Sequence, residues 1–126
     1  NSMDAWNTNH HNSSGLVQKV KESNITESIA ERETISFLSK YVSKGTSPLC
    51  GNTICQDRRF LARCMPELES FCHYRSIDVS SIRELGKRWY YEDVDNFQKN
   101  SNHRALDDIR DSINELRYYR KTIFKL

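Results

Sequence analysis

The sequence lacks the features that would place it in a membrane or a secretory pathway. No apolar run approaches the roughly 20 residues that a membrane-spanning helix needs. The first twenty residues are polar and contain no apolar stretch typical of a signal peptide. Neither sign of charge predominates, because 19 Lys and Arg stand against 17 Asp and Glu, for a net charge of +2. Bulk charge therefore does not predict nucleic-acid binding, and any recognition of phosphate must be local.

Closely spaced cysteine pairs of the kind that bind zinc are also missing. The four cysteines are Cys50, Cys55, Cys64 and Cys72. We expect them to be reduced, structural thiols in a reducing compartment, the cytoplasm. Asn24 opens a glycosylation sequon, which we interpret as chance because no secretory signal accompanies it.

What the sequence does contain is a series of amphipathic segments, typical of a single domain over residues 1–126. The spacing predicts helices over residues 2–11, 16–23, 55–65 and 103–118. It also predicts one helix that Thr26 caps and that runs to Tyr41, one that begins at Pro66, and one that Ser80 or Ser81 caps. Short strands are expected at 49–52 and 74–81. Within 55–65 we expect Phe60, Leu61 and Cys64 to face inward, while the basic runs RRF, GKR and YYRK indicate solvated surfaces. The mixture predicts an α/β fold.

The final helix carries an apolar stripe with an aspartate at its edge. The stripe consists of Leu106, Ile109, Ile113 and Leu116, at spacings of three, four and three. At about 100° per residue, Asp108 falls on the flank of the stripe and Asp107 near the opposite side. We therefore expect Asp108 to lie at the edge of the core and Asp107 at the surface. Ser101 or Asn102 is the expected cap.

Two further residues complete a candidate catalytic group. Asp57 follows the predicted strand in GNTICQDRRF and opens a helix, at the edge of the sheet where α/β proteins usually place their sites. His103 stands at the start of the helix that carries Asp108. Carboxylates bind Mg²⁺ or Mn²⁺, and a neutral imidazole takes a proton from an attacking water. The group indicates metal-assisted hydrolysis, although Asp57 alone equally fits a helix-start acid and His103 a cap or surface residue.

Four stretches carry a resemblance to a known family: WNTNHHNSSGL, GNTICQDRRFLARCMPELE, HYRSIDVSSIRELGKRW and HRALDDIRDSINELRYYR. From about Asp4 to Leu126 the chain resembles oligoribonuclease, a small 3′→5′ exoribonuclease of the DEDD superfamily, in its histidine-containing subgroup. The resemblance implies a ribonuclease H-like exonuclease fold. It also implies that Asp57 and Asp108 are metal ligands and that His103 is the general base. Two Mg²⁺ or Mn²⁺ ions roughly 4 Å apart are implied as cofactors.

The same resemblance implies a substrate of very short RNA, down to dinucleotides, cleaved to 5′-mononucleotides. Trp6 and Tyr74 match the aromatic residues that hold the bases, with Tyr74 supplied by the partner subunit of a homodimer. Such stacking is worth about 1–3 kcal/mol per base. By pattern alone, Trp6 fits a core residue and Tyr74 the start of a strand. The positions that close around the 5′-terminal phosphate are matched by His11, Thr53, Arg75 and Ser80, with Arg75 as the charge clamp and Thr53 in place of the usual serine.

The family's first motif, an Asp-x-Glu on an opening strand, has no counterpart before Trp6. We therefore expect an N-terminally truncated fold that is mostly helical with a partial sheet. This absence leaves an alternative to the enzyme, which is a catalytically incomplete fragment that binds oligonucleotides or dimerises. A plain helical interaction domain is a third reading, which the ordered motif matches disfavour.

Overall fold

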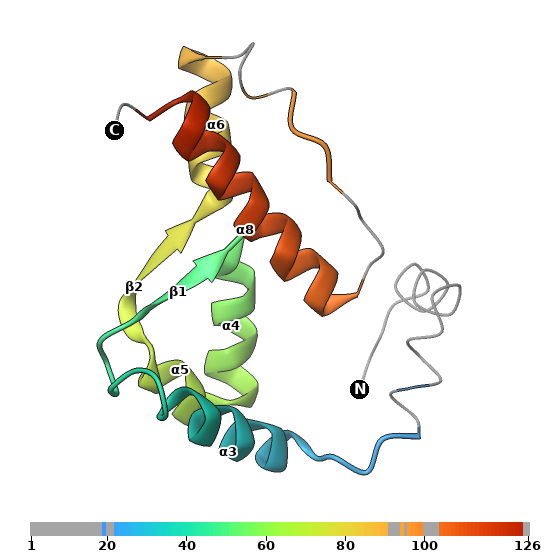
Figure 1. Cartoon of the computed structure of the whole chain (residues 1–126). Helices are drawn as coiled ribbons and strands as arrows, with labels where there is room; N and C mark the ends of the chain where they lie inside the picture. Colours follow the sequence, from blue (N-terminus) through green and yellow to red (C-terminus); the bar gives the residue numbers. More distant parts are fainter. Residues whose placement is uncertain (1–18, 20–21, 91–93, 95, 100–103, 125–126) are drawn as a thin grey trace.

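The structure is a computed structural model, and it describes residues 19, 22–90, 94, 96–99 and 104–124. The helices expected over 2–11 and 16–23 lie outside these residues, apart from 19, 22 and 23. No helix in the described part is long and apolar enough to span a bilayer. The elements run in the order α3 (Glu27–Leu38), β1 (Pro48–Gly51), α4 (Ile54–Cys64), α5 (Pro66–Phe71), β2 (His73–Asp78), α6 (Val79–Trp89) and α8 (Ala105–Thr122) (Figure 1).

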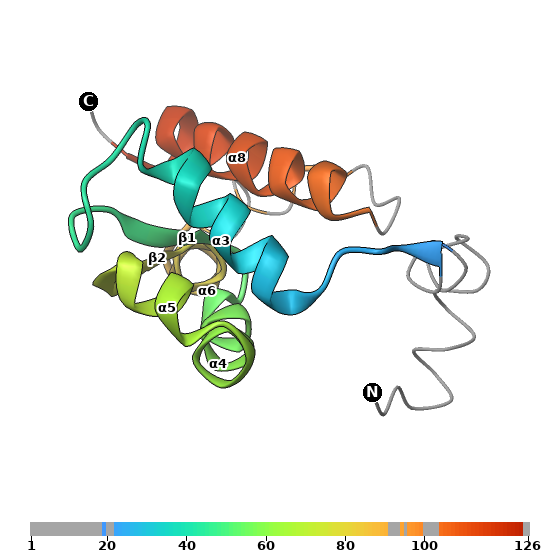
Figure 2. The ribbon, with the colours of Figure 1, turned by 90° about the horizontal axis from the view of Figure 1, so that it is seen from below.

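The two strands form a small parallel sheet between helices. Leu49 pairs with Ser76 and Gly51 with Asp78. Parallel neighbours need a crossover connection, which α4 and α5 supply here. Figure 2 shows α8 on one side of the strands and α4 and α5 on the other. The arrangement confirms the predicted α/β class, mostly helical with a partial sheet.

β2 is irregular where it leaves its first pair. Pro48 pairs with His73, but the next pair is Leu49 with Ser76, so Tyr74 and Arg75 have no partner on β1. We call these two residues the β2 bulge. A bulge takes residues out of the hydrogen-bonded ladder and turns their side chains in a new direction. Both bulge residues are exposed, Tyr74 to 74%.

The principal buried cluster lies where α6 meets α8. Its fully buried members are Val79, Val94 and Tyr119. Gly86 allows the close approach, because a Cβ there would lie 2.5 Å from Cγ2 of Val94 and 3.1 Å from Cδ1 of Ile123. The cluster fixes the start of α6 and the last turns of α8 relative to each other.

Local signals predicted the helix starts of the first half well. The Thr26 hydroxyl caps α3 by accepting from the Ile29 N–H at 3.2 Å, and Pro66 opens α5. The end of α3 was predicted too late. The helix stops at Leu38, where Ser39 donates from both its N–H and its hydroxyl to the Ile35 carbonyl, so Tyr41 lies beyond it.

The inward face predicted for α4 is wrong. Phe60 is 63% exposed and Cys64 is exposed, while Leu61 is half-buried. The helix instead turns Ile54 and Arg58 inward, and only 18% of the Arg58 side chain is exposed. The RRF run predicted a solvated surface, but Arg58 does not lie on one. Its guanidinium is bound to β2 and α5. All four cysteines are free, but Cys50, Cys55 and Cys64 are exposed, so these three are not the structural thiols that the sequence predicted.

β2 is shorter than predicted, because Asp78 ends it and caps α6. Oδ1 of Asp78 accepts from the Ser80 N–H at 2.9 Å, so neither Ser80 nor Ser81 is the cap. A carboxylate gains more than a hydroxyl at this position, since it also opposes the positive end of the helix dipole. Val79, which falls within the predicted strand, instead opens the helix and is 2% exposed.

The predicted faces of α8 are also wrong, and the helix runs to Thr122 rather than residue 118. The predicted stripe is largely exposed, with Leu106 at 56%, Ile109 at 55% and Ile113 at 46%. Asp108 is exposed and Asp107 is half-buried, the reverse of the prediction. The prediction assumed that the most apolar face of the helix is the buried one. The face that packs contains Glu115 and Tyr119, both 0% exposed. Arg104 stands at the cap position, where its side chain makes no capping hydrogen bond, and the predicted caps lie outside the described residues.

Candidate active site

The residues that follow the two strands meet at one edge of the sheet, because parallel strands end on the same side. Thr53 follows β1 and Ser80 follows β2, and their hydroxyl oxygens lie 3.2 Å apart. The Thr53 N–H donates to Ser80 Oγ at 3.0 Å and to Asp78 Oδ1 at 2.9 Å. Two of the four predicted phosphate-binding residues, Thr53 and Ser80, therefore lie side by side.

Thr53 adopts an unusual backbone conformation at this junction. Its φ of 51° and ψ of 42° lie in the left-handed region, which β-branched residues rarely occupy. The two hydrogen bonds of its N–H hold it there. Because Ser80 gives its own hydroxyl proton to Asn52, the Thr53 hydroxyl is the donor in its 3.2 Å contact with Ser80.

A cleft of about 690 Å³ opens beside this junction, between α4 and α8. Asp57 from α4 and Asp108 from α8 both line it. Both side chains are exposed, and within the described part of the chain neither carboxylate makes a hydrogen bond or ion pair. Two unpartnered carboxylates facing one cleft leave their oxygens available to a cation.

The donor set fits a hard divalent ion, but the described residues supply only part of it. Mg²⁺ prefers oxygen ligands and is often bound by one or two carboxylates with water completing its shell. No group of three or more His, Cys, Asp or Glu side chains suited to a metal occurs among the described residues. The predicted general base, His103, lies outside them, as do Trp6 and His11.

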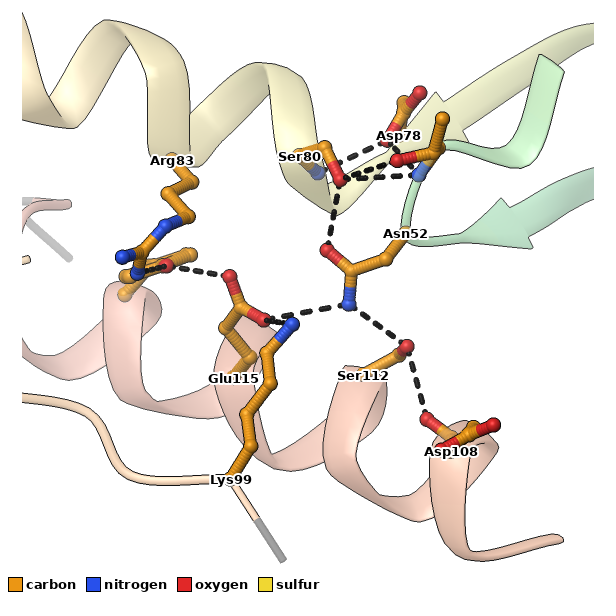
Figure 3. A network of polar contacts seen from close by, with 10 residues as sticks. Asn52, Asp78, Ser80, Arg83, Lys99, Asp108, Ser112 and Glu115 are labelled. Atoms are coloured by element: carbon orange, nitrogen blue, oxygen red, sulfur yellow. Dashed lines mark hydrogen bonds and ion pairs between the residues drawn. The ribbon is translucent and has the colours of Figure 1, made fainter. Parts of the chain in front are cut away.

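Asn52 connects Ser80, at the start of α6, to α8 (Figure 3). Its amide nitrogen donates to Ser112 Oγ at 2.8 Å and to Glu115 Oε1 at 3.3 Å. Its amide oxygen accepts from Ser80 Oγ at 3.0 Å. Ser112 in turn donates to the carbonyl of Asp108 at 3.0 Å. One side chain thus sets the helix that bears Asp108 against the ends of both strands.

Glu115 is fully buried beneath the cleft and is satisfied by several donors. Lys99, which lines the cleft, places Nζ 2.8 Å from Oε1 of Glu115, and the Tyr119 hydroxyl donates to Oε2. Burial and this bond to Glu115 raise the pKa of Tyr119 to about 12. Sequence reasoning missed Asn52, Lys99 and Glu115, because only non-local contacts assign them a role.

Tyr74 and Arg75 lie away from the cleft, on the β2 bulge. The Arg75 guanidinium lies over the Tyr74 ring, 5.2 Å from its centroid, and the His73 ring stacks on Tyr74 at 4.5 Å. No hydrogen bond within the described part joins Arg75 to Thr53 or Ser80. The structure therefore brings together the carboxylate pair and the hydroxyl pair, but it does not bring Arg75 to the hydroxyls of its own chain.

Comparisons with known proteins agree on one family. The sequence model of an exonuclease family, RNase_T, matches residues 1–116. The chain is 61% identical over 125 residues to an oligoribonuclease of Legionella pneumophila (strain Corby), covering 99% of this chain and 67% of that protein. It is 59% identical over 122 residues to an oligoribonuclease of Dichelobacter nodosus (strain VCS1703A), covering 97% and 67%. An oligoribonuclease of Halorhodospira halophila (strain DSM 244 / SL1) is 55% identical over 125 residues, covering 99% and 68%. The chain thus spans about two thirds of the length of these relatives.

Proposed function

Because this chain belongs to the exonuclease family and is a nuclease of the oligoribonuclease type, we propose that it removes 5′-mononucleotides from the 3′ end of very short RNAs, down to dinucleotides. The reaction is phosphodiester hydrolysis with two divalent ions, Mg²⁺ or Mn²⁺, in a homodimer in the cytoplasm. Similarity to nucleases over 99% of the chain favours the enzyme over a catalytically incomplete binding fragment.

The observation that carries the proposal is the carboxylate pair in the cleft. Asp57 and Asp108 come from two different helices, face the same space and have no partner within the described part of the chain. In the proposed reaction they bind the divalent ions, which activate water and stabilise the leaving oxygen when bound. His103 accepts the proton of the attacking water.

The hydroxyl pair sits beside the cleft and suits a terminal phosphate. Thr53 and Ser80 bring two hydroxyl groups together at the start of two helices, where anions are favoured, and a bound phosphate would take over the protons that they now give to Ser80 and Asn52. His11 and Arg75 complete this phosphate site, which limits the length of the RNA. Trp6 stacks on one base and Tyr74 of the partner subunit on the other, and such stacking tolerates any base. Arg75 extends from the same bulge as Tyr74, so the two side chains reach a neighbouring site together.

The test is hydrolysis of a 5′-labelled RNA dinucleotide in Mn²⁺ by the wild type and by Asp108→Asn. The substitution keeps the size of the side chain but removes the charge that binds the ion. We expect the rate to fall roughly a hundredfold or more, by analogy with the loss of other groups that stabilise transition-state charge. Asp107→Asn is the matched control, because Asp107 is next to Asp108 but does not line the cleft; this variant keeps the wild-type rate. Equal rates for Asp108→Asn and the wild type would refute the assignment.

A further inference from the structure

Arg58 occupies the space behind the β2 bulge. Its Nη2 donates to the carbonyl of His73 at 2.9 Å and to that of Arg75 at 3.4 Å. These carbonyls belong to the residues on either side of Tyr74 in the chain. Nε donates to Ser76 Oγ at 3.1 Å, where β2 resumes its pairing with β1. The guanidinium therefore bonds the strand before, within and after the bulge.

The guanidinium is itself held in place from a third element. Nη1 of Arg58 donates to Glu69 Oε1 on α5 at 3.0 Å, in a half-buried ion pair. A planar guanidinium donates several hydrogen bonds in fixed directions, whereas a lysine ammonium is a flexible point charge. The site thus uses a property that only arginine has.

Neighbouring positions on α4 point to different places. Asp57 lines the cleft of its own chain, whereas Arg58, about 100° further round the helix, faces β2. Arg59 is exposed and bonds only the Gln56 side chain, at 3.2 Å, among the interactions of the described residues. Asp57 and Arg58 are therefore able to serve two different substrate sites from one helical turn.

We propose that Arg58 is a positioning residue for the β2 bulge, and that through Tyr74 and Arg75 it acts on substrate bound in the partner subunit. The inference rests on the proposed function, in which Tyr74 stacks on a base across the dimer. Arg58 replaces the ladder contacts that the bulge lacks on the β1 side, and so fixes the direction in which Tyr74 projects. Without this support the exposed bulge has several conformations, and substrate binding must select one of them.

The first experiment separates binding from chemistry. For Arg58→Met we expect KM for an RNA dinucleotide to rise roughly tenfold, within the range for loss of one stacked base, with kcat changed less than about twofold. Arg58→Lys keeps the charge but not the fork of donors, and we expect a KM close to that of Arg58→Met. Arg59→Met is the matched control with wild-type kinetics. A fall in kcat at unchanged KM would overturn the inference, since it would place Arg58 in the chemistry of its own cleft.

The second experiment determines whether replacing Arg58 raises the KM of the active site in its own subunit or in the partner subunit. Mixed dimers of Asp108→Ala with Arg58→Met are isolated with two affinity tags. The centre that keeps Asp108 receives Tyr74 from the chain with an intact Arg58. We expect a wild-type KM and about half the wild-type rate per dimer, because one centre of two is active. A raised KM in the mixed dimer would show that Arg58 acts within its own chain, and would overturn the inference.

A parallel mixture of Asp108→Ala with Tyr74→Ala separates this inference from the proposed function. If the Tyr74→Ala mixture recovers a wild-type KM and the Arg58→Met mixture does not, Tyr74 acts across the dimer but Arg58 does not position it. If neither recovers, Tyr74 does not act in the neighbouring site, and both the function assigned to Tyr74 and the inference are wrong. Circular dichroism and dimer mass check that each variant folds. Where Arg58→Met fails that check, Arg58→Lys takes its place and the same outcomes decide.

Discussion

Glu115 illustrates how a single buried charge organises the residues around it. The carboxylate has no exposed surface and accepts from Asn52, Lys99 and Tyr119. Removing one partner of a buried ionic group typically costs about 3–5 kcal/mol, because the remaining charge is left uncompensated. These three donors come from the β1–α4 turn, the segment before α8 and α8 itself, so their loss would loosen the floor of the cleft.

Tyr119 makes the stability of the protein depend on pH in the alkaline range. Its pKa is raised from 10 to about 12 by burial and by its bond to Glu115. The folded state therefore holds this proton more tightly than the unfolded state. The resulting stabilisation is complete below pH 10 and is lost as the pH rises towards 12. Urea denaturation across this window will show a decline in the free energy of unfolding that is larger in the wild type than in Tyr119→Phe, by on the order of 2 kcal/mol.

The neighbouring tyrosine supplies the control for this titration. Tyr118 is half-buried and packs on Phe97, without a bond to Glu115 among the described contacts. Tyr118→Phe is the matched variant, because it removes a tyrosine hydroxyl without removing a bond to Glu115. If the wild type and Tyr119→Phe decline in parallel, the hydroxyl of Tyr119 is not the group that titrates.

At the scale of elements, the sequence predicts those features that depend on residues close together in the chain, such as the starts of helices. Thr26 and Pro66 mark helix starts through local hydrogen bonding and a fixed φ, and both predictions are confirmed. The inward faces of α4 and α8 were mispredicted because tertiary contacts select them. Arg58 is inward since β2 offers it carbonyl oxygens, and Glu115 is inward since Lys99 neutralises it. Hydrophobic periodicity assigns such residues to the surface.

In the candidate site, too, the features that depend on local sequence were predictable and those that depend on tertiary contacts were not. That Asp57 and Asp108 would line the same cleft was predictable, because both sit at the start of helices in an α/β pattern. The β2 bulge was not, since it depends on the register between two strands that are distant in the sequence. The bridging role of Asn52 could not be predicted either, because its partners Ser80 and Ser112 come from two other elements.

The contact between α6 and α8 depends on the absence of a side chain at Gly86. In Gly86→Ala the new methyl group meets Val94 at 2.5 Å, and overpacking of this kind costs typically 1–3 kcal/mol. The gain in helix propensity returns about 1 kcal/mol. We expect a net loss of roughly 1 kcal/mol in the free energy of unfolding, measured by chemical denaturation. Ser81→Ala, on the exposed side of α6, changes propensity without the clash and should not destabilise. A Gly86→Ala variant at least as stable as the wild type would contradict this packing.

At the scale of the whole molecule, the divalent ion that we propose for the cleft would link α4 to α8. Binding to the folded state alone stabilises by about 2.7 kcal/mol when the free ion is at a hundred times its Kd. Thermal denaturation should therefore show a rise in Tm of roughly 10 °C on addition of Mn²⁺. Asp108→Asn should lose most of this rise and Asp107→Asn should keep it. An identical rise in Asp108→Asn would place the ion elsewhere.

Thr53 combines an unfavourable left-handed backbone conformation with the hydroxyl that we propose to bind phosphate. A left-handed residue with a β-branched side chain costs on the order of 1–3 kcal/mol, and asparagine occupies the same conformation more readily. Directed evolution for heat resistance would consequently enrich Thr53→Asn and discard the hydroxyl that faces Ser80. Selection for stability would therefore remove the hydroxyl that we propose to bind phosphate, whereas selection for the proposed activity would retain it.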